Sequence, residues 1–145
     1  DTVKAARGTV VRADTTLSGD EDGYDAVILP GGMPGAEHLA ASPKVKKLLL
    51  NMASKGRIVA AICASPALVL SPLGMLDGKK ATCYPGMETN FTANVKPSKE
   101  SVVQDGNIIT SRGPATAFPF ALKIAENLVG NEMAELGAKQ TLYLA

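Results

Sequence analysis

Apolar runs of strand length alternate with amphipathic stretches of helical periodicity along this chain. Residues 24–29 and 57–62 form apolar runs that are typical of buried strands. Between them, residues 43–55 carry lysines on one helical face and apolar residues on the other. These apolar residues are Val45, Leu48, Leu49 and Met52. Gly56 follows where helices commonly end on a glycine, so the region predicts a strand, a helix and a second strand.

The second half of the chain continues the alternation. Residues 102–103 and 107–110 read as strands joined by Asp105-Gly106, a pair that is typical of hairpin turns. Residues 115–129 predict a long helix, with Phe118, Leu122, Ile124 and Leu128 expected on its inward face. Shorter strands are expected at residues 9–11 and 81–84, and shorter helices at residues 87–91 and 132–142. This order predicts an α/β fold: a mostly parallel sheet with helices on both faces.

Composition narrows the class of protein. The 145 residues include 15 basic and 14 acidic side chains, which leaves a formal charge of +1 and no electrostatic case for nucleic acid. No apolar run approaches the ~20 residues of a membrane span, and no signal segment opens the chain. Two cysteines are too few for a disulfide framework, so we expect a reducing, cytoplasmic setting.

Cys63 carries the strongest indication of chemistry. It follows the apolar run 57–62 and precedes a helical stretch in which Ser65 is a candidate N-cap and Pro66 a first-turn residue. A cysteine at such a strand-to-helix turn faces the positive end of a helix, which favours the thiolate and exposes it to a ligand. The alternative is a small buried hydrophobic residue, since free cysteines are often buried.

Three unusual loops follow strands of the expected sheet: Gly31-Gly32, Cys63-Ala64 and residues 111–114. Because ligands of such sheets bind beyond the carboxyl ends of the strands, we expect the three loops to meet. The N–H groups of Gly32 and Ala64 are then candidates for an oxyanion hole beside Cys63.

Other candidates carry weaker indications. Tyr84 lies at a strand end and is expected to orient substrate rather than act as a base. Arg112 is expected either to hold an anionic group or to brace its loop. His38 is the single histidine and is expected on the surface. Cys83 is expected in the core, although a redox pair with Cys63 stays open. No metal-ligand spacing and no nucleotide-binding motif is present in the sequence.

Three motifs carry a family resemblance. In order, they are Leu-Pro-Gly-Gly at residues 29–32, Ala-Ala-Ile-Cys-Ala-Ser-Pro at 60–66 and Thr-Ser-Arg-Gly-Pro at 110–114. The chain resembles the ThiJ/PfpI superfamily, in the branch of the human parkinsonism-associated deglycase. The resemblance implies a flavodoxin-like three-layer sandwich, a nucleophilic Cys63, and an oxyanion site with Gly31, Gly32 and Ala64. It also implies a homodimer and action on α-oxoaldehydes such as methylglyoxal without a cofactor.

The chain departs from the family pattern in two ways. Tyr84 stands where many relatives have a histidine, and Ala64 stands where the protease-like branch has one, which argues against peptidase activity. The family opens with a strand, a helix and a strand, and that opening carries a glutamate that contacts the cysteine. The 145 residues have no counterpart of it, so we expect residues 1–145 to form one N-terminally incomplete domain.

Three functions remain open at this point. The first is an aldehyde-processing enzyme of the glyoxalase III or deglycase type, in which the thiolate of Cys63 attacks the aldehyde carbon. The alternative is a non-enzymatic oxidative-stress sensor or chaperone-like protein in which Cys63 is oxidised to a sulfinic acid. The third is a scaffold in which the motifs only preserve the fold.

Overall fold

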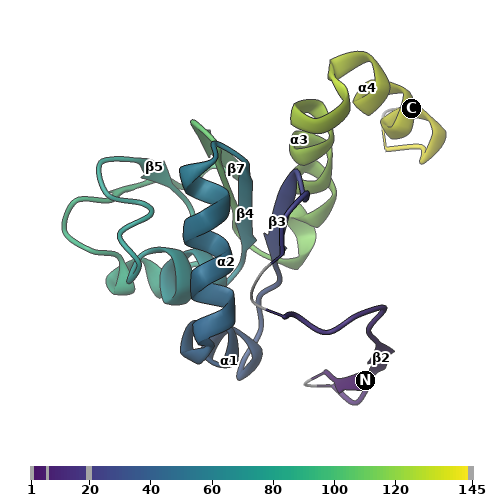
Figure 1. Ribbon diagram of the computed structural model, residues 1–145. Helices are drawn as coiled ribbons and strands as arrows, with labels where there is room; N and C mark the ends of the chain where they lie inside the picture. The colour runs from purple at the N-terminus through teal and green to yellow at the C-terminus, as the bar shows by residue number, and fades with distance from the viewer. Residues whose placement is uncertain (1, 6, 19–20, 144–145) are drawn as a thin grey trace.

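A four-stranded sheet lies at the centre of the computed structural model, which describes residues 2–5, 7–18 and 21–143 (Figure 1). Its strands run in the order β3 (Ala26–Leu29), β4 (Ile58–Ile62), β8 (Ile108–Ser111) and β7 (Val102–Asp105). β3, β4 and β8 are parallel, whereas β7 pairs antiparallel with β8 across a turn at Gly106. The prediction of a mostly parallel sheet is therefore confirmed.

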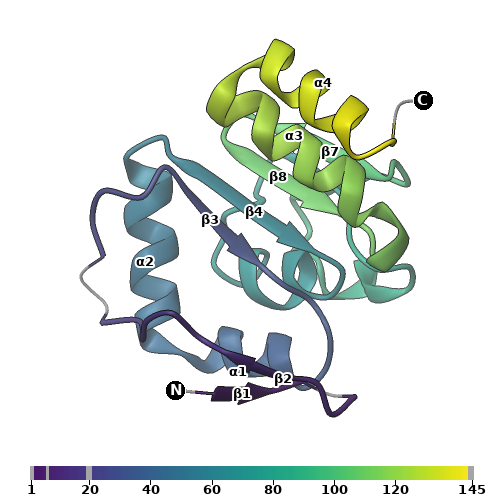
Figure 2. The same ribbon diagram turned by 90° about the vertical axis from the view of Figure 1, so that its right-hand side faces the viewer.

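Helices cover both faces of this sheet and give the molecule three layers. α2 (Pro43–Ser54) lies on one side of the sheet and α3 (Ala117–Val129) on the other, as Figure 1 shows with the sheet seen close to edge-on. α1 (Gly35–Ala41) leads into α2, and α4 (Asn131–Gln140) packs on the outside of α3 (Figure 2). This arrangement confirms the α/β sandwich that the alternation of strands and helices predicts.

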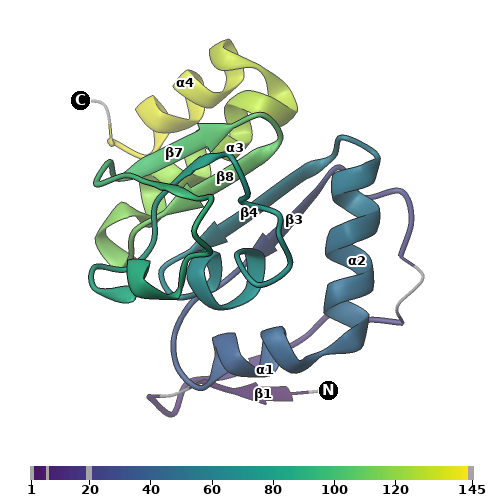
Figure 3. The ribbon, with the colours of Figure 1, turned by 90° about the vertical axis from the view of Figure 1, so that its left-hand side faces the viewer.

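The remaining elements are short. β1 (Thr2–Lys4) and β2 (Val10–Arg12) form an exposed antiparallel pair that is separate from the four-stranded sheet and projects away from it (Figure 1). The segment after β4 forms the helix η1 (Pro66–Leu70) and then a series of turns on the α2 side of the sheet (Figure 3). The other short elements are β5 (Lys80–Ala81), η2 (Met87–Asn90), β6 (Lys96–Pro97) and η3 (Pro114–Thr116). Within the described ranges, no helix has the length and hydropathy that crossing a bilayer requires.

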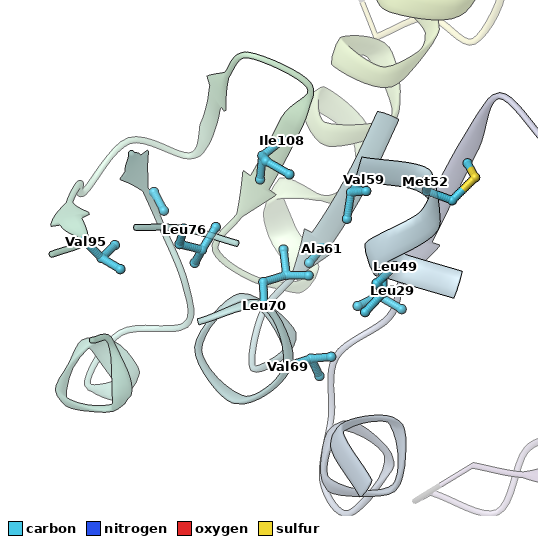
Figure 4. Packing of buried hydrophobic residues seen from close by; sticks show 11 residues of the cluster. Leu29, Leu49, Met52, Val59, Ala61, Val69, Leu70, Leu76, Val95 and Ile108 are labelled. Carbon is cyan, nitrogen blue, oxygen red and sulfur yellow. The ribbon is translucent and has the colours of Figure 1, made fainter. Parts of the chain in front are cut away.

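The core has two parts because successive side chains of β4 point to opposite faces of the sheet. Val59 and Ala61 face α2 and η1, where they pack with Leu49 and Leu70 (Figure 4). Ala60 faces α3 and packs in a second cluster with Ile109, Phe120 and Ile124. Both clusters hold β4 rigidly from its two sides, and Cys63 is the residue that follows this strand.

The inward face of α3 differs from the predicted one. Ile124 is buried as expected, but Phe118 and Leu128 are 36% and 44% exposed, and Phe120 takes the inward position. α3 is apolar on more than one side because α4 packs against it. Phe118 stacks on Tyr143, with ring centroids 4.4 Å apart, in place of packing on the sheet.

The expected strand at residues 81–84 is also shorter than predicted. Only Lys80 and Ala81 pair as strand residues. The next amides find other acceptors: that of Thr82 donates to the hydroxyl of Thr110 at 3.0 Å, and that of Tyr84 donates to the carbonyl of Cys63 at 2.9 Å. These bonds draw the segment off the β-ladder and toward the Cys63 turn.

Candidate active site

The sheet register brings the three unusual loops together. Leu29 of β3 pairs with Ala61 of β4, and Ile62 of β4 pairs with Ser111 of β8, so the three parallel strands end at one edge. The amide of Cys63 then donates to the carbonyl of Ser111 at 2.9 Å, beyond the last strand pair. The loops after β3, β4 and β8 therefore meet as the sequence predicts, at the edge where α/β sheets bind ligands.

Cys63 occupies a left-handed backbone conformation with a φ of 65°. Such a conformation is uncommon for residues with a Cβ and costs about 1–3 kcal/mol, and it occurs often at functional sites. Two backbone hydrogen bonds hold it, from Cys63 N to Ser111 O and from Tyr84 N to Cys63 O, each 2.9 Å long. The side chain is partly exposed, so the predicted strand-to-helix elbow presents an accessible sulfur.

Gly31 lies directly against this elbow. A Cβ at position 31 would come within 2.4 Å of Cys63 Cβ and 2.8 Å of Ile62 O, and 3.1 Å from Cys63 Sγ. Because Cβ atoms essentially never approach other heavy atoms within 3.0 Å, glycine at position 31 lets the two loops come this close. Glycine is therefore required at position 31 because of close packing, and not because the backbone has a positive φ there.

The hydroxyl of Ser65 connects the same two loops in an unexpected way. The prediction that Ser65 caps a helix is wrong: its backbone is already helical, with φ −66° and ψ −33°, and its side chain makes no capping bond. The fully buried hydroxyl donates instead to the carbonyl of Pro30, in the loop after β3. The helix that follows is η1, with five residues, so the groups facing the sulfur are local amides rather than the dipole of a long helix.

Two such amides are available beside Cys63. Gly32 and Ala64 both line the depression onto which Cys63 opens. Within the described part of the chain, neither N–H group has a hydrogen-bond acceptor, whereas the carbonyl of Gly32 accepts from Ala36 N at 2.9 Å. The pair that the sequence predicts as an oxyanion hole thus has free donors on residues that line the same depression as Cys63.

The depression has a volume of about 480 Å³, and three further side chains form its wall. Met33 comes from the loop after β3, Pro85 comes from the segment that leads into η2, and Met87 is the first residue of η2. The sequence analysis did not identify these residues. No local sequence pattern marks them, and residues 85–87 are brought near Cys63 by distant contacts such as the bond from Tyr84 N to Cys63 O.

Tyr84 and Arg112 differ in how close they come to the depression. Tyr84 lines it, is 47% exposed, and lays its ring against Gly113, where an added Cβ would meet the ring at 3.5 Å. Arg112 does not line it: its Nη1 donates to the carbonyl of Lys99 at 2.9 Å. Of the two roles expected for Arg112, the geometry supports bracing of the loop.

The other ionisable candidates lie outside the depression. His38 is exposed on α1 and lines a separate hollow with Leu39 and Val45. Among the described residues, no group of three or more His, Cys, Asp or Glu side chains is placed to hold a metal ion. Cys63 is therefore the reactive group that the depression offers.

Cys83 is a buried thiol behind the site. It is 1% exposed and its Sγ donates to the carbonyl of Tyr84 at 3.5 Å. Burial raises its pKa to about 12, and the negative charge of Glu88 acts in the same direction, against the opposing charge of Arg112. Cys83 therefore stays a neutral thiol at physiological pH, in keeping with the core position expected for it.

A cysteine held on a strand-to-helix elbow of an α/β sandwich, beside two free amides, defines a class of proteins with a nucleophile elbow. Residues 1–127 match the model of the DJ-1/PfpI family, and the chain belongs to this family.

Individual relatives agree with this assignment. The chain is 43% identical to Protein dj-1beta of Drosophila melanogaster over 144 residues, which cover 98% of the chain and 76% of the relative. It is 37% identical to the glutathione-independent glyoxalase DJR-1.2 of Caenorhabditis elegans, with coverage of 90% and 69%. The solved structure of oxidized Toxoplasma gondii DJ-1 superimposes with a TM-score of 0.93 at 40% identity, covering 99% of this chain and 78% of that one. Two longer relatives from Arabidopsis thaliana are spanned to only 32% and 34% of their length.

Gly31→Ala tests the close approach of the two loops. The new Cβ would meet Cys63 and Ile62, so we expect a loss of stability of roughly 1–3 kcal/mol and a slower reaction of Cys63 with iodoacetamide. Gly35→Ala is the matched control, because a Cβ there meets nothing within 4 Å. Urea unfolding and mass-resolved labelling measure both effects, and equal behaviour of the two variants would show that Gly31 has no special packing role.

The raised pKa of Cys83 predicts a pH dependence of stability. The thiol ionises near its ordinary value of 9.0 in the unfolded chain but only at about 12 in the folded one. Between these values the unfolded state binds fewer protons, so this thiol's contribution to the free energy of unfolding falls as pH rises from 9 toward 12. We expect the stability advantage of the wild type over Cys83→Ala to shrink from pH 8 to pH 10.5 in urea unfolding, and a constant difference would contradict the shift.

Proposed function

We propose that this protein is a cofactor-independent enzyme of the glyoxalase III or deglycase type that acts on α-oxoaldehydes such as methylglyoxal. The observation that carries the proposal is the placement of a partly exposed Cys63 on a strained elbow beside the free amides of Gly32 and Ala64. A relative in the same family is named a glutathione-independent glyoxalase, which supports this class of reaction.

The reaction begins when the sulfur of Cys63 bonds to the aldehyde carbon of methylglyoxal. The carbonyl π pair moves to oxygen, and the resulting hemithioacetal oxyanion accepts hydrogen bonds from Gly32 and Ala64. A proton then leaves this carbon and another is added to the neighbouring carbonyl carbon through an enediol, which leaves a thioester of the hydroxyacid. Water attacks the thioester, releases lactate and restores the thiol, so no external oxidant or reductant is needed.

Proton transfer between the two carbons needs a further group. In the described ranges, no carboxylate or histidine lines the depression, and Tyr84 offers its phenol as a hydrogen-bond donor to the substrate carbonyl. The proposal assigns the transfer to the glutamate that the family resemblance implies. We also propose that the protein forms a homodimer and is located in the cytoplasm.

Cys63→Ser tests the proposed chemistry in the complete gene product. A serine hydroxyl is a far weaker nucleophile, so we expect lactate formation from methylglyoxal to fall by at least roughly a thousandfold. Cys83→Ala is the matched control, because this buried thiol does not line the depression, and it should keep activity within a fewfold of wild type. Wild-type turnover by Cys63→Ser would overturn the proposal.

A second candidate function is an oxidative-stress sensor. One structural relative was solved in a form described as oxidized, and Cys63 is the more accessible of the two cysteines here. A hydroperoxide would transfer one oxygen to the sulfur and leave as an alcohol or water, and a second equivalent would give the sulfinate. The amides of Gly32 and Ala64 are placed to donate to its oxygens.

Titration with hydrogen peroxide tests whether Cys63 acts as an oxidative-stress sensor. With equimolar to tenfold hydrogen peroxide, the intact mass should rise by about 32 Da in wild type and in Cys83→Ala but not in Cys63→Ser. Peptide mapping should place both oxygens on Cys63. A mass gain confined to methionines would exclude the sensor.

A further inference from the structure

Apolar residues form much of the wall of the Cys63 depression. Met33 is 44% exposed and Met87 is partly buried, and both line the depression together with Pro85. Methionine thioethers are flexible and polarisable, and they adapt to apolar and aromatic groups of different shape. Met33 and Met87, which come from separate segments of the chain, thus present a polarisable apolar surface to a ligand that is bonded to Cys63.

Among the described residues, the side chains that line the depression are uncharged: none belongs to Asp, Glu, Lys, Arg or His. Glu88 follows Met87 in the chain, and its carboxylate accepts a hydrogen bond from the N–H of the lining residue Gly86 at 2.7 Å, where it would repel an anionic substituent. The guanidinium of Arg112 is engaged by the carbonyl of Lys99.

The depression is also large for a three-carbon aldehyde. Its volume of about 480 Å³ lies within the ~300–1,000 Å³ of sites that hold drug-sized ligands. Methylglyoxal bound to Cys63 would leave most of the methionine wall in contact with water. A substrate with a larger apolar substituent would remove that surface from water and gain affinity.

We propose that Met33 and Met87 make this site selective for α-oxoaldehydes that carry an uncharged apolar or aromatic substituent. The dicarbonyl end lies at Cys63 and the two amides, and the substituent lies against the two thioethers. This inference rests on the proposed function, and it names the substrate class of the same site.

The test compares phenylglyoxal with 4-carboxyphenylglyoxal, two substrates that differ by one charged group. We expect wild type to favour phenylglyoxal by roughly tenfold or more in kcat/KM, measured as formation of the corresponding mandelates. Met33→Lys should lower the ratio of the two kcat/KM values, because its ammonium group attracts the carboxylate of 4-carboxyphenylglyoxal.

Met33→Ala and Met87→Ala should each lower kcat/KM for phenylglyoxal more than for methylglyoxal. Met133→Ala removes an exposed methionine of α4 and should change neither substrate.

A second measurement does not depend on turnover. The rate at which N-phenylmaleimide labels Cys63, divided by that of N-methylmaleimide, should fall in both methionine-to-alanine variants and stay constant in Met133→Ala. If no aldehyde is turned over but the labelling ratio falls, the proposed function is wrong and the apolar selectivity stands. If aldehydes are turned over but neither ratio responds to Met33 or Met87, the inference is overturned and the enzyme assignment stands.

Discussion

The left-handed backbone at Cys63 is the constraint on which the rest of the site depends. A residue with a Cβ adopts this conformation at a cost of about 1–3 kcal/mol. The fold offsets that cost with hydrogen bonds at both the amide and the carbonyl of Cys63, and with a glycine at position 31 that leaves room for its Cβ. The direction of the Cα–Cβ bond of Cys63 is therefore set by backbone groups.

These restraints come from three strands at once. Ser111 belongs to β8, Pro30 follows β3, and Cys63 itself follows β4, so the elbow is held by the sheet rather than by its own loop. The buried hydroxyl of Ser65 extends this connection to the segment after Cys63. Because parallel strands in register end at one edge, a local change in one loop is transmitted directly to the position of the sulfur.

The local sequence pattern predicts much of this arrangement, but it does not predict the features that depend on contacts between residues far apart in the chain. The strand before Cys63, helix α2 and the meeting of the three loops follow from periodicity and glycine placement. The partner of Ser65 does not, because Pro30 lies 35 residues away. The inward face of α3 is ambiguous for a related reason: its apolar residues serve both the sheet and α4, and no pattern within the helix assigns Phe118 to one of them. Met87 is likewise brought to the site by distant contacts, among them the backbone bond from Tyr84 N to Cys63 O.

The two candidate functions compete for one electron pair. The sulfur lone pair that bonds to an aldehyde carbon is the same pair that accepts oxygen from a peroxide. The amides of Gly32 and Ala64 are placed to donate to either product, since a hemithioacetal oxyanion and a sulfinate both place negative oxygen beside the sulfur. A sulfinate cannot form the hemithioacetal and the thioester of the proposed reaction, so oxidation of Cys63 would end catalysis in the molecules that undergo it. Cys83 is buried, and burial raises its pKa to about 12, so it stays a neutral thiol and a weak nucleophile toward a sulfenic acid formed on Cys63.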